Sequence, residues 1–298
     1  MNAATVALAL LAASSNATAS VLMRRAATGP AGAPRAARWV FWSGGAGLLA
    51  CSAVLQAAAL AVGGLSVVQP LLASELLFMP AIGGAVFHRR PDRTTWLSFL
   101  ALAAGLALFL GAAAPTAGRA TADESRWLPA GTAVLCLVLL LAGLSRLVAG
   151  APRAAVLGLA SAVLFAATAA LIKEVTGRLP RGGPAALAAD WTPYATAVTG
   201  LTAFALLQCA FRAGTLVASQ PALTLGDALT GVVLGWTLFG EHIALGARML
   251  PEAAGVALMA AGTFGLARAP AVSGQWDAEP APAVVRYRTK AQAEAEST

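Results

Sequence analysis

Charged residues are scarce in this sequence, at 11% of the chain against the roughly 25% that is usual in soluble domains. Histidine occurs twice, cysteine three times and lysine twice, whereas 58% of the 298 residues are hydrophobic. The shortage of charge excludes an ordinary soluble globular protein. The few histidines, cysteines and acids also lack the spacing of a metal site, so we expect no bound metal and no cofactor.

Nine apolar segments reach the length of about 20 residues that a helix needs to cross a bilayer. They span residues 5–23, 40–62, 65–87, 96–114, 128–147, 154–172, 194–211, 216–239 and 251–267. The sequence therefore predicts an all-α membrane protein with nine transmembrane helices. The three cysteines fall within these segments, where we expect them to be small buried residues without disulfides.

The basic residues predict how the chain is oriented in the cytoplasmic membrane. Fourteen of them lie in the C-terminal tail or in the loops after the first, third, fifth and seventh segments, and six lie on the opposite side. By the positive-inside rule the C-terminus is cytoplasmic and the N-terminus is outside. Arg24 and Arg25 follow the first segment, unlike the basic residues of a signal peptide, so we interpret this segment as a retained span. The net charge of +7 then reflects topology in a lipid bilayer, and we expect no nucleic-acid partner.

An internal repeat relates the two halves of the chain. The matches, each 150 to 152 residues apart, pair Ala17-Thr18-Ala19 with Ala167-Thr168-Ala169, Gln56 with Gln208, Gln69-Pro70 with Gln220-Pro221, Glu75 with Asp227, and Ala104-Gly105 with Ala254-Gly255. Each match is weak in a chain so rich in alanine, but their common order argues against coincidence.

The repeat divides the chain into a first four-helix unit at 1–127, a connector helix at 128–150 and a second four-helix unit at 151–269. Because a single connector helix reverses the direction of the chain, the second unit is expected to be inverted relative to the first. Transporters commonly use this plan, with the substrate site near the membrane midplane at the repeat interface. We expect residues 270–298 to form a disordered cytoplasmic tail.

Asp227 lies near the middle of the 216–239 segment, where an acid costs roughly 2.5 to 3.5 kcal/mol and usually faces the bundle interior or a water-filled cavity. Gln220 and Thr224 precede it at helical spacing and share its face. Pro221 frees a backbone carbonyl that needs a partner. We interpret this face as the polar wall of a translocation pathway; the alternative is that Asp227 pairs statically with a neighbouring helix.

Glu75 lies halfway through the 65–87 segment and corresponds to Asp227 in the repeat. On an ideal helix it would point away from Gln69, although Pro70 can bend the helix. The two acids can face each other across the repeat interface, and their proximity would make proton coupling possible. In the alternative interpretation, Glu75 pairs statically with a basic residue.

The competing partners for Glu75 are Arg146 and Arg212. Gln56 and Gln208 can either bond neighbouring helices together or contact substrate. Glu241 follows the 216–239 segment directly, and we expect it at the surface.

The stretch from Pro221 to His242 ends in Leu238-Phe239-Gly240-Glu241-His242 and precedes Gly255-x-Ala257-Leu258. It resembles the carboxyl half of an EamA-type unit of the drug/metabolite transporter superfamily. The nine-span layout and the Trp39-Val40-Phe41-Trp42 opening of the second segment are similar to the NIPA-type magnesium transporters of that superfamily. That branch has an acid followed three residues later by asparagine, where this chain has Ala53 and Gln56.

The resemblance implies a secondary transporter that works by alternating access. We expect its substrate to be a small polar or amphipathic metabolite, with protons as the candidate coupling ion. Asp227 and Glu75 are the expected coupling or contact residues. The other candidate site residues are Gln220, Thr224, Gln69, Gln56 and Gln208, with Pro70 and Pro221 as the expected helix irregularities. The alternatives are a divalent-cation (magnesium) transporter and a non-transporting membrane anchor or regulator. No nucleophile, base and orienting group recur together, so we do not expect an enzyme.

Overall fold

The computed structural model describes residues 2–28, 35–87, 91–113, 115–116, 118–214, 216–242 and 249–269. The predicted tail at 270–298 lies outside these described residues. The helices in chain order are α1 (Ala3–Thr28), α2 (Arg35–Val62), α3 (Leu65–Leu72), α4 (Glu75–Phe87), α5 (Arg93–Ala113), α6 (Glu124–Leu144), α7 (Gly150–Ala188), α8 (Thr192–Ala213), α9 (Leu216–Phe239) and α10 (Met249–Arg268).

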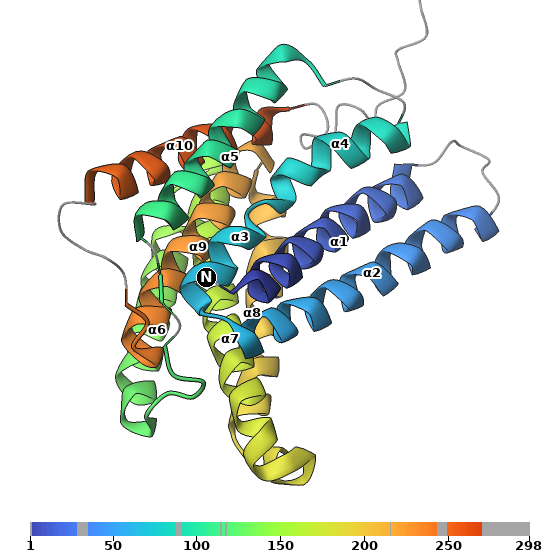
Figure 1. The fold of residues 1–298 in the computed structure, drawn as a ribbon. Helices are drawn as coiled ribbons and strands as arrows, with labels where there is room; N and C mark the ends of the chain where they lie inside the picture. Colours follow the sequence, from blue (N-terminus) through green and yellow to red (C-terminus); the bar gives the residue numbers. More distant parts are fainter. Residues whose placement is uncertain are drawn as a thin grey trace, which may run out of the picture.

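Nine helical spans in the described part of the chain are long and apolar enough to cross a membrane, with α3 and α4 together forming the third (Figure 1). The prediction of an all-α membrane protein with nine spans is therefore confirmed. The only β pairing in the described ranges is an isolated bridge between Thr116 and His242. Apart from α7, the span boundaries lie within about five residues of the predicted apolar segments, and α9 begins and ends where the 216–239 segment does.

The third span is broken between α3 and α4. At the break the backbone tightens, because Ala73 N–H donates to Pro70 O at 3.1 Å and Ser74 N–H donates to Leu71 O at 3.0 Å, each across three residues instead of four. Glu75 is then the first residue of α4. The acid therefore sits at the N-terminus of a half-helix, where the helix dipole favours negative charge.

Helix α7 differs from the sequence prediction. The sixth apolar segment was predicted to end at residue 172, but α7 continues through the glycine- and proline-rich residues 176–188 and reaches the bottom of the view (Figure 1). Gly183 interrupts the helix with φ of 69°, a left-handed conformation that glycine adopts without a steric penalty. Pro184 follows as the start of the next helical turn, which is a position that suits proline. Glycine and proline here bend a helix instead of ending it.

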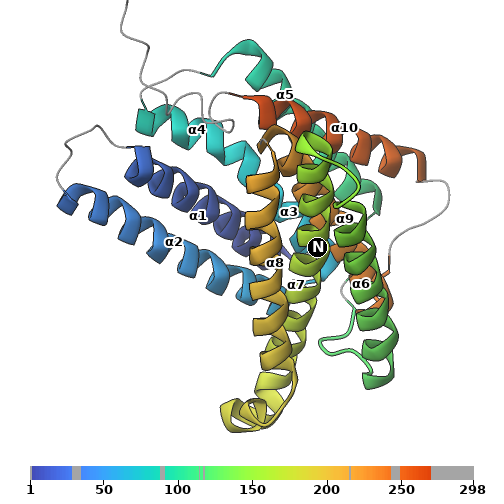
Figure 2. The same ribbon diagram turned by 180° about the vertical axis from the view of Figure 1, so that it is seen from behind.

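The same helix pairing recurs in the two halves of the chain. Helix α1 packs along α2 and against α3 and α4, and α7 packs along α8 and against α9. Between the halves, α3 contacts α9 and α5 contacts α10. Both views show α5 and α10 crossing on one side of the bundle, away from the α1–α2 pair (Figures 1 and 2).

The α5–α10 crossing depends on two glycines. A Cβ atom on Gly105 would lie 2.8 Å from the carbonyl oxygen of Gly255, and one on Gly255 would lie 3.0 Å from the carbonyl oxygen of Gly105. The two backbones therefore touch, as small residues allow where membrane helices cross. These glycines are also equivalent positions in the predicted repeat.

The exterior of the bundle is apolar. Leu100, Leu201 and Trp236 are 58%, 72% and 56% exposed. All three cysteines are exposed as well, so the expectation that they would be buried is wrong. Lipid tails are as apolar as leucine, and an apolar surface is therefore stable in a bilayer although it would be unstable in water.

Candidate functional site

Asp227 on α9 is bonded to a glutamine of the broken span. Gln69 Nε2 on α3 donates to Asp227 Oδ1 at 3.2 Å. Gln69 is almost completely buried, whereas Asp227 is half-buried. The other amide atom, Gln69 Oε1, has no hydrogen-bond partner within the described residues. The amide therefore holds the carboxylate and leaves one buried acceptor available for a donor.

Glu75 is bonded to a second amide, that of Asn16 on α1, which donates to Glu75 Oε2. Both side chains are half-buried. In the described part of the chain Glu75 forms no ion pair with Arg146 or Arg212, so the alternative that pairs Glu75 with one of these arginines is wrong. Sequence reasoning missed Asn16, although an asparagine inside the first apolar segment was itself a signal.

Neither carboxylate has a basic partner within the described residues. Each is bonded to an amide, Glu75 to Asn16 and Asp227 to Gln69, and in that part of the chain neither takes part in an ion pair. Burying an ionised carboxylate without a compensating cation is costly, and such a group is normally neutralised. This cluster, which we call the acid pair, can therefore hold protons or a cationic group.

The other predicted residues of α9 lie near the acid pair without bonding to it. Gln220 and Thr224 are half-buried and precede Asp227 on the same helix face. Pro221 is buried, and α9 runs through it without a break. Pro70 is also buried, and α3 ends two residues later. The predicted helix irregularity therefore appears in the first half only.

Gln56 and Gln208 lie on α2 and α8, the second helices of the two halves. Both are half-buried, and within the described ranges neither is hydrogen-bonded to the acid pair. The structure thus bonds Gln69 to Asp227 and Asn16 to Glu75, and leaves Gln56 and Gln208 outside these hydrogen bonds.

A second buried charged group lies at the end of the bundle where α9 ends. Glu241 was expected at the surface, but it is completely buried and its Oε1 lies 2.5 Å from Nζ of Lys173 on α7. The ammonium also lies 4.5 Å from the ring centroid of Phe239, a favourable cation–π contact. Because Lys173 and Glu241 are 68 residues apart, no local pattern could reveal the pair.

Glu241 also caps α3. Its carboxylate accepts hydrogen bonds from the backbone N–H groups of Leu65 and Ser66, both at 2.7 Å, and from Ser66 Oγ at 2.5 Å. A Cβ atom on Gly235 would lie 2.4 Å from Glu241 Oε2, so this carboxylate fits only beside glycine. Helix α3 is consequently bonded to the second half of the chain at its start through Glu241 and, through Gln69, at Asp227.

Comparison with known proteins identifies a relative of this chain. Over 205 residues the chain is 31% identical to a Corynebacterium glutamicum protein described only as uncharacterized, and the match covers 67% of this chain and 69% of that protein. No protein-family profile matches the chain, and no solved structure matches it.

Proposed function

The chain belongs to the same family as the Corynebacterium glutamicum protein, and we propose that it is a secondary transporter of the drug/metabolite type. In this proposal it moves a small polar metabolite across the cytoplasmic membrane by alternating access. The observation that carries the proposal is the acid pair, two carboxylates inside apolar spans that are bonded to amides and have no basic partner in the described part of the chain.

The acid pair is costly for a protein that only anchors itself in a membrane. Acids within spans are rare, and where they occur they mark substrate or ion pathways. A static structural role would be served by a basic partner, and neither acid has one among the described residues. A pathway that binds and releases protons or cations explains why the two charges are left uncompensated.

The contacts of α3 with the second half of the chain support a mechanism in which one half moves against the other. This half-helix touches the second half of the chain through Glu241 at its start and through Gln69 at Asp227. In this proposal the tightened turn before Glu75 is the hinge at which α3 and α4 change their relative orientation. Discontinuous spans of this kind form substrate and ion sites in many secondary transporters.

The helix pairing supports two inverted four-helix repeats joined by α6. In each half the first helix packs against the second and the third, and the third and fourth spans meet their counterparts in the other half. The contact between Gly105 and Gly255 joins equivalent positions. In the proposed arrangement the acid pair lies at the interface between the repeats, near the midplane.

The polar atoms of the site favour a substrate that donates hydrogen bonds. Gln69 Oε1 is a buried acceptor with no partner among the residues that the structure describes, and both carboxylates are acceptors when ionised. An ammonium or a hydroxylated cation would satisfy these atoms and compensate the charge. We therefore propose a cationic or donor-rich metabolite, exchanged against protons at the same carboxylates.

A thermal-shift screen of the purified full chain tests this assignment, because a ligand that binds the folded state raises the unfolding temperature by mass action. The screen would include amines, amino acids, polyols and Mg²⁺. We expect a cationic or hydroxylated metabolite to raise the melting temperature of the wild type and to lose this effect in Asp227→Asn.

The matched control is Asp92→Asn. Asp92 is exposed and accepts a capping hydrogen bond from the backbone N–H of Thr95, and an asparagine at this position can accept the same bond. This variant should keep the shift. A ligand whose shift survives in both Asp227→Asn and Glu75→Gln would show that the acid pair is not the site, and a shift by Mg²⁺ alone would favour divalent-cation transport.

A further inference from the structure

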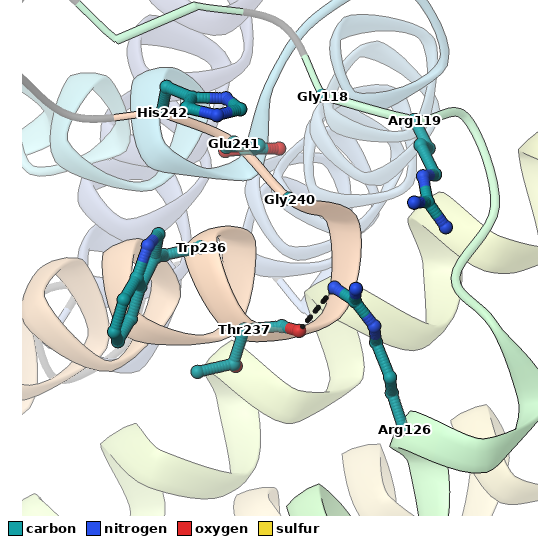
Figure 3. A pocket seen from close by; sticks show the side chains of 8 residues that line it. All are labelled: Gly118, Arg119, Arg126, Trp236, Thr237, Gly240, Glu241 and His242. Atoms are coloured by element: carbon teal, nitrogen blue, oxygen red, sulfur yellow. Dashed lines mark hydrogen bonds between the residues drawn. The ribbon is translucent and has the colours of Figure 1, made fainter.

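A pocket separate from the acid pair opens beside the end of α9. It has a volume of about 720 Å³ and lies between the segment before α6, the first turn of α6 and the last turn of α9 (Figure 3). The segment is held in place because Arg119 N–H donates to Phe239 O at 2.8 Å and Thr116 N–H donates to His242 O at 3.1 Å. One side of the pocket is therefore formed by two segments whose backbones are hydrogen-bonded to each other.

Two arginines dominate the charge of this pocket. Arg119 and Arg126 extend from opposite parts of its wall toward the same space (Figure 3). Arg126 Nη1 donates to Thr237 O at 3.1 Å, and the two guanidinium groups share the carboxylate of Asp123, at 2.5 Å and 3.3 Å. Each guanidinium has five N–H donors, and these contacts leave most of them without a partner among the described residues.

The remaining charges do not cancel this positive potential. One carboxylate, that of Asp123, faces two guanidinium groups. Glu241 also lines the pocket, but its charge is already compensated by Lys173. His242, another lining residue, is exposed. The pocket is thus a positively charged recess with guanidinium forks, which fit phosphate oxygens in a bidentate manner.

The pocket lies beside the apolar exterior. Trp236, which lines it, is 56% exposed, and Leu128, two residues after Arg126, is 79% exposed. Tryptophan at such a boundary is typical of the membrane interface, where headgroups lie. An anion bound by the arginines would have lipid tails or water within reach.

We propose that the pocket between the α6 and α9 ends binds a phosphate-bearing anion through Arg119 and Arg126. A phospholipid headgroup and free phosphate share this chemistry. Because exposed Trp236 places the pocket at the boundary between lipid and water, the anion can come from either source. By the charge distribution of the loops, this end of the bundle is the predicted outer face of the membrane.

Binding is tested on the delipidated full chain in neutral detergent with three probes: dihexanoylphosphatidylglycerol, inorganic phosphate and dihexanoylglycerol, which has the same chains without phosphate. We expect the Arg119→Gln/Arg126→Gln double variant to bind the phosphate-bearing probe at least about tenfold more weakly, because charge-assisted hydrogen bonds are lost. Asp123→Asn should bind it more tightly, because the competing carboxylate is removed. Arg146→Gln, an exposed arginine just beyond the other end of α6, should be unchanged.

The outcomes separate the sources. Binding of phosphatidylglycerol without binding of inorganic phosphate identifies a lipid site, whereas comparable binding of both identifies a phosphate site. Equal binding of dihexanoylglycerol, wild-type affinity in the double variant, or absence of binding by both phosphate probes would overturn the proposal. A normal melting temperature of each variant excludes unfolding as the cause, and the test does not depend on transport by the acid pair.

Discussion

Lys173 Nζ on α7 lies 2.5 Å from Glu241 Oε1, and the two side chains are only 4% and 0% exposed. Through the same carboxylate the pair is connected to the N-terminus of α3. Removing one member of a buried ion pair leaves the other charge uncompensated, which costs more than the pair itself contributes. The contact therefore holds three helices together at one end of the bundle.

Lys173→Met removes the charge and leaves an unbranched side chain that is shorter by the terminal ammonium group. We expect the free energy of unfolding to fall by about 3 to 5 kcal/mol, as when other buried pairs are broken. Chemical unfolding in detergent micelles measures the change. Lys173→Met/Glu241→Gln should regain part of the loss, because glutamine carries no charge; a single variant as stable as the wild type would show that Glu241 does not need the lysine.

Gly105→Ala tests the α5–α10 crossing. Its Cβ would lie 2.5 Å from Met259 N, so the helices must separate, and overpacking of this kind costs about 1 to 3 kcal/mol. Gly111→Ala is the matched control on the same helix, since no atom lies within 4 Å of its added Cβ. The control should be neutral or stabilising by up to about 1 kcal/mol. Equal melting temperatures for the two variants would argue against a close crossing.

Asp190, in the turn between α7 and α8, predicts a dependence of stability on pH. Burial opposes its ionisation, but hydrogen bonds from Thr192 N–H, at 2.9 Å, and from Arg178 outweigh burial and lower the pKa of the carboxyl. Because the pKa is lower in the folded state, the stabilisation is fully present above the unfolded value of about 3.9 and is lost as the pH falls through the folded pKa.

Melting temperatures recorded from pH 7 to pH 3 measure this effect. Asp190→Asn should be less stable than the wild type at pH 7, and the difference should shrink below pH 4. A difference that stays constant across this range would mean that ionisation of Asp190 does not contribute.

Apolar length was sufficient to predict the nine spans, because a helix in lipid must satisfy its own backbone hydrogen bonds over the full thickness of the bilayer. The same reasoning identified Asp227 and Glu75 as unusual. Composition failed at residues 176–189, where glycine and proline bend α7 without ending it. It also failed for the cysteines, since burial in a membrane protein cannot be inferred from apolar character alone.

The partners of the charged residues could not be predicted. Asn16 and Glu75 are 59 residues apart, and Gln69 and Asp227 are 158 apart, so their contacts depend on how whole helices pack. The repeat pairs Glu75 with Asp227 and therefore suggested that the acids are related. It gave no information on Asn16, which falls outside the matched positions, and the match of Gln69 to Gln220 did not predict that Gln69 bonds to Asp227.

Flux in proteoliposomes tests the proposed transport most directly. Wild-type protein, Asp227→Asn and the control Asp92→Asn would be reconstituted at equal density, and uptake of the metabolite found by thermal shift would be followed with and without a proton gradient. We predict that the wild type and Asp92→Asn transport it, and that Asp227→Asn falls to the level of empty liposomes while its melting temperature shows that it is folded. Undiminished, gradient-dependent flux by folded Asp227→Asn would contradict the assignment of Asp227 to the transport pathway.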